Sequence, residues 1–262
     1  MSCLYDYPQL YDVLFSDTCT TEIRFIESVL QKFCPQHRRT AMSVFEPACG
    51  TGRLLWRLAK RGYNVAGLDL NTKSVAYCNR RMLRHALTAR SFCGDMTNFT
   101  LADLQRKQPF DAAYNLVSSF LHLTNDTQAR QHLAAVAGVL KPDGIYILGL
   151  HLKPAGQAFC GSESWSMRHG TLSLHSKLRT LSCNSRKHVE TVEFRIDVRT
   201  PKKRYSVIDR FPLRTYTAKQ FYRLLKSANC FRIIETYTFD YDIEHPIKVN
   251  DTTEDTLFIL RR

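Results

Sequence analysis

Acidic residues and glycines lie where predicted strands end, and this arrangement suits a polar, nucleotide-like ligand. The first strand ends in Glu46, and Gly50 and Gly52 follow it just before a predicted helix. Glycine lets the backbone turn sharply and approach a ligand closely, and the free N–H groups at a helix start can bind an anionic group. The turn therefore predicts a binding site at the end of the first strand.

The turn differs from the dinucleotide-binding pattern G-x-G-x-x-G. Leu55 takes the place of the third glycine, and Glu46 lies four positions before Gly50. A carboxylate at this position would repel a pyrophosphate, but it can accept a hydrogen bond from the ammonium of an amino-acid ligand. S-adenosylmethionine has an amino-acid end, a ribose and an adenine, and it has no phosphate. The turn therefore favours this cofactor over a nicotinamide dinucleotide.

Two further strand ends offer groups that match the rest of such a ligand. The second strand ends at Asp69, whose carboxylate can accept from both ribose hydroxyls. The third ends in Gly94-Asp95-Met96, where the Asp95 carboxylate and the following backbone N–H can meet the adenine edge. Taken singly, Glu46, Asp69 and Asp95 could be a core carboxylate, a helix cap and a turn residue. Because they follow successive strands, we expect them to form one cofactor site.

Alternating strands and helices must position these groups. A helix over 22–33 precedes the first strand, and the KPDG turn at 141–144 introduces the fifth. Thr72 is expected to cap the second helix of the alternation. Such alternation predicts right-handed crossovers and a parallel sheet with helices on both faces. The predicted strands span 42–47, 64–70, 89–95, 110–118 and 144–152, and the helices between them span 54–62, 72–85 and 127–140.

The pattern changes after residue 152. Apolar and polar residues alternate over 171–182, 188–199 and 203–213, which predicts an antiparallel insertion over about 158–214. We expect the insertion to cover the acceptor or to make a dimer contact. A helix over 217–228 and strands over 231–239 and 255–262 then return to the main sheet as an antiparallel terminal hairpin. Residues 1–262 are thus expected to form a single domain, with 1–38 as an N-terminal lid and cap helix.

Composition and size limit the class of protein. The chain has 262 residues, of which 44% are hydrophobic, and its longest apolar runs are too short to cross a bilayer. The first residues lack the features of a secretion signal, so we expect a cytoplasmic protein without membrane contact. The nine cysteines include no CxxC pair, which favours reduced thiols and no metal site.

The net charge of +13 favours anionic partners such as RNA, acidic headgroups or phosphorylated metabolites. The basic residues are dispersed along the chain, which favours a solvated surface over a nucleic-acid footprint. A nucleic-acid partner is therefore not expected, although the charge leaves it open.

The segments ExACGTGR, GLDL, GDM and FDAAYNLVSSFLHL resemble the successive motifs of class I S-adenosylmethionine-dependent methyltransferases. The resemblance covers roughly 40–150 and the terminal hairpin, and it implies an α/β Rossmann-like fold with a seven-stranded, mostly parallel sheet. It also implies that S-adenosylmethionine binds and leaves as S-adenosylhomocysteine. The positions expected to contact the cofactor are Tyr11, Glu46, Ala48, Cys49, Gly50, Thr51, Gly52, Arg53, Asp69, Leu70, Asp95, Met96, Asn115, Leu116 and Val117.

The N-terminal YDYPQLYD segment and the β-rich insertion are similar to small-molecule N-methyltransferases that act on amino sugars or on glycine and sarcosine. This resemblance implies a small-molecule acceptor, with an amine favoured, and a monomer or a homodimer. It does not name the acceptor or the methylated atom.

Methyl transfer from a sulfonium is an in-line displacement, so positioning and exclusion of water can supply much of the catalysis. A protonated amine must first lose its proton, and His122 or His151, which follow the fourth and fifth strands, can accept it. Each can instead be structural. Tyr11, with Tyr5 and Tyr7, is expected to close over the cofactor or to pack against the body. Two further candidates for the acceptor pocket are Trp165 and Arg168, at the start of the insertion. Either they line that pocket or they only pack within the insertion.

Three other functions remain open at this point. A nucleic-acid methyltransferase would use the same cofactor, but enzymes that flip a base often carry N/D-P-P-Y/F where this chain has Asn115-Leu-Val-Ser. A nicotinamide oxidoreductase is disfavoured by Glu46 and Leu55. A catalytically silent module would bind the cofactor without turnover.

Overall fold

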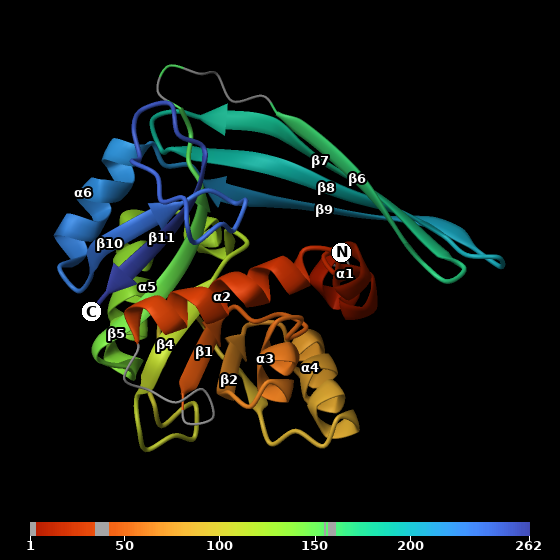
Figure 1. Ribbon diagram of the computed structural model, residues 1–262. Coiled ribbons are helices and arrows are strands. Elements are labelled where there is room, and N and C mark those ends of the chain that lie inside the picture. Colours follow the sequence, from red (N-terminus) through yellow and green to blue (C-terminus); the bar gives the residue numbers. More distant parts are fainter. Residues whose placement is uncertain (1–3, 35–41, 155, 157–160) are drawn as a thin grey trace.

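A seven-stranded sheet forms the body of the computed structural model, which describes residues 4–34, 42–154, 156 and 161–262 (Figure 1). The strand order is β10-β11-β5-β4-β1-β2-β3. The first five strands along the chain run parallel, and β11 pairs antiparallel with both β5 and β10. The predicted fold class is confirmed. The strands are β1 (Ser43–Pro47), β2 (Asn64–Asp69), β3 (Arg90–Cys93), β4 (Phe110–Asn115), β5 (Leu140–His151), β10 (Arg232–Tyr237) and β11 (Asp255–Arg261).

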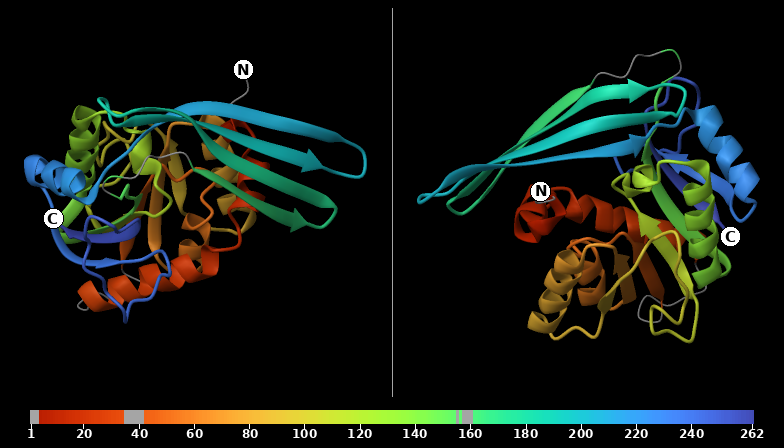
Figure 2. Two further views of the ribbon diagram at one scale, coloured as in Figure 1. Left: turned by 90° about the horizontal axis from the view of Figure 1, so that it is seen from above. Right: turned by 180° about the vertical axis from the view of Figure 1, so that it is seen from behind.

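Helices cover both faces of this sheet (Figures 1 and 2). Neighbouring β1 residues point to opposite faces, so Val44 packs in one hydrophobic cluster and Phe45 in another. The cluster around Val44 contains side chains of α2 (Cys19–Phe33), α3 (Leu55–Lys60) and α4 (Thr72–Arg84). The cluster around Phe45 contains side chains of α5 (Asp126–Val139) and α6 (Ala218–Ala228). The strands are therefore buried on both faces, and their ends are the places where polar groups reach solvent.

Asn71, and not Thr72, caps α4. The Asn71 side chain accepts a hydrogen bond from the Ser74 backbone N–H at 2.9 Å, whereas Thr72 is already the first helical residue. An N-cap needs an extended backbone so that its side chain can turn back to the N–H groups of the first turn, and only Asn71 has it. The prediction for Thr72 was wrong by one residue.

The KPDG segment is a bulge at the start of β5 rather than a turn before it. The pairing of β4 with β5 shifts register between Phe110 and Ala112, which lie opposite Leu140 and Ile145. Asp143 takes up the extra length with a φ of 62°. The strand thus begins four residues earlier than the sequence pattern indicates.

A second, antiparallel sheet follows β5 in the chain and projects beyond the body as an arm (Figure 1). It has four strands where the sequence pattern predicted three, because the first one was missed. That strand has no fully buried residue, and its apolar face consists of only Trp165 and Met167, which is too short an alternation to indicate a strand. The strands are β6 (Ser162–His169), β7 (Leu172–Asn184), β8 (Val189–Arg199) and β9 (Arg204–Arg214).

The N-terminal segment packs beneath the second sheet (Figure 1). It comprises η1 (Leu4–Asp6) and α1 (Pro8–Leu14), and Leu10 and Leu14 join a hydrophobic cluster with Leu174 and Ile196. Parts of the predicted lid and insertion, at 1–3, 35–38 and 158–160, lie outside the described residues. Within the described part of the chain, no helix has the length and apolar character that a membrane span requires.

Candidate active site

A cleft opens at the carboxyl ends of β1 to β4, where such a sheet is expected to bind its ligand. It consists of two adjoining hollows of about 470 and 30 Å³, which share Tyr11, Ala48, Gly50, Val117 and Ser119 as lining residues. We call both together the strand-end cleft. The smaller hollow is also lined by Glu46, Pro47, Cys49, Arg53, Leu54, Asn115 and Leu116, and the larger by Tyr5, Asp69, Leu70, Asn71, Ser74, Gly94, Asp95, Met96, Thr97, His122, Leu123 and Gln128.

Glu46 and Asn115 provide buried acceptor oxygens in the smaller hollow. Glu46 Oε2 accepts a hydrogen bond from the Tyr114 hydroxyl at 2.8 Å, and burial raises the pKa of the Glu46 carboxyl well above its usual value. Asn115 Nδ2 donates to the Pro47 carbonyl, whereas Asn115 Oδ1 is buried without a hydrogen-bond partner in the described structure. Unpaired buried acceptors are costly, so this end of the cleft suits a cationic donor such as an ammonium.

The turn after β1 brings the backbone against Asp69 at the end of β2. Gly50 N–H donates to Asp69 Oδ2 at 2.7 Å, and Asn71 N–H donates to Oδ1 at 2.8 Å. Burial nevertheless raises the pKa of Asp69, against the effect of these two hydrogen bonds. Gly52 has a φ of 68°, and a Cβ there would lie 2.3 Å from Cys78 Sγ, so this position requires glycine. Asp69 therefore both shapes the turn and faces the cleft.

The end of β3 supplies the far wall of the larger hollow. Asp95 is exposed and accepts from the backbone N–H and the hydroxyl of Thr97. The Met96 carbonyl accepts from His132 Nδ1 at 2.9 Å, which fixes the backbone at this strand end. Leu70, which follows β2, also lines this hollow, and 73% of its surface is exposed. A large apolar side chain left open beside a cavity suits contact with a flat ring.

Three of the predicted cofactor residues, Thr51, Gly52 and Arg53, stabilise the turn after β1. Thr51 Oγ1 donates to Asp12 at 3.1 Å and, like Gly52, does not line the cleft. Arg53 reaches the smaller hollow, but its guanidinium forms a bidentate ion pair with the fully buried Glu22 of α2. Burial alone would lower the pKa of Arg53, but the hydrogen bonds and charge of Glu22 outweigh burial and raise this pKa. The pair fastens the turn to α2.

Tyr5, Tyr11 and His122 meet at the opening of the cleft. The Tyr5 hydroxyl lies 3.1 Å from His122 Nε2, and the Tyr5 ring lies 5.8 Å from the Tyr11 ring. Phe211 of β9 packs 5.1 Å from the His122 ring. Burial lowers the pKa of His122, although the charge of Asp209 opposes this, so its imidazole is neutral near pH 7. Burial raises the pKa of Tyr11 to about 12.

The structure places His151 away from this opening, since it does not line the strand-end cleft. Its Nδ1 pairs with Asp255 Oδ1 at 2.5 Å, and its ring packs against Phe239. Burial lowers the pKa of His151, but Asp255, with Glu163 and Glu190, raises it overall. The catalytic role of His151 stays a prediction.

Trp165 and Arg168 also lie apart from the cleft. Trp165 packs between Phe15 and Phe194, at ring distances of 5.8 and 5.6 Å. Arg168 donates to the Gly170 carbonyl at the β6–β7 turn. Trp165 thus packs on both the N-terminal segment and the insertion, and a role of either residue toward the acceptor stays a prediction.

Tyr114, His132 and Glu22 bind groups that line the cleft, and the sequence pattern did not indicate them. Glu22 and His132 lie in stretches that also hold other polar residues, so the local sequence did not distinguish them. His132 Nε2 accepts from the Tyr146 hydroxyl at 2.8 Å, because its Nδ1–H is already donated to Met96. Their partners lie on other elements, so the pairing was not visible in the chain.

The fold and the site together define a class I methyltransferase architecture. Residues 44–144 match the sequence family described as a methyltransferase domain. Over its full length the chain is similar to the crystal structure of an S-adenosylmethionine-dependent methyltransferase from Clostridium acetobutylicum, with 16% identity, 97% of each chain covered and a TM-score of 0.74. An amino pentose methyltransferase from Micromonospora echinaspora, solved with S-adenosylmethionine, has 19% identity, 98% and 96% coverage and a TM-score of 0.72.

Curated relatives match less than half of the chain. A putative methyltransferase of a Geobacillus strain is 29% identical over 48% of this chain and 49% of its own length. A dTDP-3-amino-3,6-dideoxy-alpha-D-glucopyranose N,N-dimethyltransferase of Streptomyces fradiae is 31% identical over 43% and 41%. An mRNA cap guanine-N(7) methyltransferase of Arabidopsis thaliana is 29% identical over 47% and 36%. The chain thus aligns with half or less of these relatives. The predicted resemblance to methyltransferases, amino-sugar enzymes among them, is confirmed.

Proposed function

We propose that this protein uses S-adenosylmethionine to methylate the nitrogen of a small-molecule amine. The observation that carries the proposal is one continuous cleft with buried acceptors at one end and a neutral histidine at its opening. Glu46 and Asn115 provide the acceptors, and His122 is the histidine. A cavity of about 470 Å³ is of the size that binds a cofactor-sized ligand.

The residues of the cleft fit the three parts of the cofactor. Glu46 and the unpaired Asn115 Oδ1 would accept from its ammonium, and this cation would bring the raised pKa of Glu46 down again. Each Asp69 oxygen accepts one backbone hydrogen bond and keeps a lone pair for a ribose hydroxyl. Leu70 and Met96 both line the larger hollow and would contact the adenine.

When bound, S-adenosylmethionine supplies an electrophilic methyl group on a sulfonium. The protein must deliver an amine with a free lone pair to it. His122 is neutral near pH 7, so it can take the proton of an incoming ammonium. The Tyr5 hydroxyl, at 3.1 Å from Nε2, orients the imidazole. Tyr11, between the two hollows, keeps water from the point of transfer.

We assign the covering of the acceptor to the N-terminal segment and the second sheet. The Leu4 backbone N–H donates to Asp209 of β9 at 2.8 Å, and Phe211 packs beside His122. Two segments far apart in the sequence therefore meet over the cleft opening. A dimer contact of the second sheet, and the choice between monomer and homodimer, stay predictions.

The test uses methyl-tritiated S-adenosylmethionine, the full chain and a cell extract, followed by separation of the products by size and by nuclease or protease sensitivity. Label in small metabolites, lost with His122→Asn, supports the proposal. Label in protein contradicts the acceptor class. Binding of S-adenosylhomocysteine without any transfer indicates a silent cofactor-binding module.

The second candidate is an RNA methyltransferase, which the net charge of +13 and the partial match to a cap methyltransferase favour. It predicts nuclease-sensitive label in the same experiment. The buried surroundings of His122 favour the small amine, because a nucleic acid needs an open approach to the site.

A further inference from the structure

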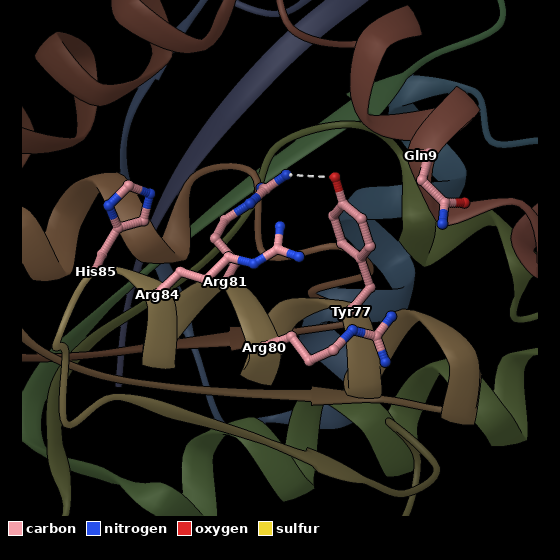
Figure 3. A pocket seen from close by; sticks show the side chains of 6 residues that line it. All are labelled: Gln9, Tyr77, Arg80, Arg81, Arg84 and His85. Carbon is pink, nitrogen blue, oxygen red and sulfur yellow. Dashed lines mark hydrogen bonds between the residues drawn. The ribbon is translucent and has the colours of Figure 1, made fainter.

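A separate hollow lies between α1 and α4 and shares no lining residue with the strand-end cleft. It measures about 330 Å³. Figure 3 shows its lining side chains, which are Gln9, Tyr77, Arg80, Arg81, Arg84 and His85. We call it the arginine pocket. We propose that it binds the phosphate group of a compact phosphorylated ligand, a phosphate monoester or a diphosphate.

Two of the three guanidinium groups are available to a ligand. Within the described structure, Arg80 and Arg84 form no hydrogen bond or ion pair, and both are exposed. They lie four residues apart, so they project from the same face of α4 on successive turns. Arginine presents planar, paired donors that match phosphate oxygens. This pair can therefore grip one phosphate group from two sides.

The third guanidinium forms the fixed floor of the pocket. Arg81 pairs with Asp12 of α1, and the Tyr77 hydroxyl lies 3.1 Å from its Nη2 (Figure 3). Asp12 also accepts from Thr51, so its carboxylate is already occupied. Among the described residues that line the pocket none is acidic, and the three arginines are its charged side chains.

Residues of α3 add to the positive field on one side. The Trp56 ring stacks on the His85 ring at 4.8 Å and an interplanar angle of 8°. Arg57 and Lys60 place their cations 4.7 and 5.3 Å from the Trp56 ring centre. Stacking holds the His85 ring at the edge of the pocket, and the nearby cations lower the free energy of a bound anion.

The shape of the pocket favours a compact ligand over a nucleic-acid strand. Gln9 of α1 closes the side opposite the arginines and offers an amide donor (Figure 3). The hollow thus has walls on two helices and can surround one or two phosphates. A strand would need a row of evenly spaced cations, and here the available guanidiniums are concentrated within one hollow.

The test measures binding of inorganic phosphate and pyrophosphate to the full chain by isothermal titration calorimetry. We expect saturable binding of pyrophosphate, and a loss of affinity of about tenfold or more in the double variant Arg80→Gln, Arg84→Gln. The matched control is Arg223→Gln, Lys226→Gln, which removes two exposed charges from α6. Its affinity should change by less than about twofold. Thermal unfolding of both variants checks folding without reference to methyl transfer.

Three results would overturn the proposal. The first is the absence of saturable binding at millimolar phosphate and pyrophosphate. The second is an equal loss of affinity in both double variants, which would indicate general charge attraction. The third is tight, salt-sensitive binding of a single-stranded RNA oligonucleotide that Arg80→Gln, Arg84→Gln weakens while pyrophosphate fails to compete. That result would make the surface a nucleic-acid track.

Discussion

The strand-end cleft and the second sheet place their functional groups in different ways. In the cleft, Glu46 and Asp69 lie at the ends of buried parallel strands, so the backbone carries them to one edge of the sheet. The second sheet is largely exposed and brings only a few groups, such as Phe211, to the opening. The cofactor side is thus positioned by strand ends, and the acceptor side by contacts between distant segments.

Substitutions in the two regions should have different effects. A change at a strand end should alter cofactor affinity, whereas a change on the second sheet should alter only the KM for the acceptor. His122 lies between the two regions, because it follows β4 but contacts both Tyr5 and Phe211. Substitutions of His122, Asp69 and Phe211 should therefore separate the two regions, and the titration of His132 should affect the stability of the fold that carries both.

His122→Asn should lower methyl transfer by about 10²- to 10⁴-fold, the contribution of a positioned general base. Cofactor affinity should change little. In the unmodified protein the rate should fall as the pH drops through the His122 pKa, which burial holds below 6.5, because the protonated ring cannot accept. The measurement is initial rate against pH.

The control for this variant is His245→Asn, which removes an exposed histidine on a loop. If the rate of His122→Asn still falls at low pH as in the unmodified protein, His122 is not the group that accepts the proton. His151→Ala, measured in parallel, tests the other predicted base. Lower turnover with unchanged cofactor affinity would support a catalytic role of His151, and undiminished turnover would contradict it.

His132 should make the fold sensitive to acid. Its pKa is lowered by burial from 6.5 to about 4, so between these values the unfolded chain binds a proton that the folded chain does not. The free energy of unfolding should therefore fall by about 3 kcal/mol as the pH drops from 6.5 to 4. Urea unfolding across this range measures it. His132→Gln, which can still donate to Met96, should flatten the dependence, and an identical slope would contradict the assignment.

Asp69→Ala should weaken S-adenosylhomocysteine binding by about 1.5–3 kcal/mol, the scale of hydrogen bonds to a charged group. Titration calorimetry measures this loss. Because Asp69 also accepts from the Gly50 and Asn71 N–H groups, Asp69→Asn serves as the milder variant that keeps one acceptor. Unchanged affinity in a folded protein would exclude Asp69 from the ribose contact.

Phe211→Ala should raise the KM for the amine about two- to tenfold, because the aromatic contact with His122 contributes about 0.5–1.5 kcal/mol. The Kd of the cofactor should stay constant. Ile208→Ala, at an exposed position of the same strand, is the matched control. A parallel loss of cofactor affinity in Phe211→Ala would break the division between the two regions.

Much of the fold could be predicted because its signals are local. The alternation of strands and helices, the terminal hairpin and the turn with Gly50 and Gly52 all appear as short-range patterns. Strand β6 was missed because most of its residues are exposed and only Trp165 and Met167 give it an apolar face. The cap of α4 was misplaced because Asn71 and Thr72 are both good caps by type, and only backbone conformation distinguishes them.

The sequence by itself determined the fold class and the series of strand ends that face a cofactor, since buried parallel strands must end at a common edge. Only the tertiary structure decided which polar groups pair. It joined Glu46 to Tyr114, Arg53 to Glu22, and Tyr5 to His122. These three pairs join residues 31 to 117 positions apart in the chain, so no local pattern encodes them. They arise because a buried polar group must find a partner within reach.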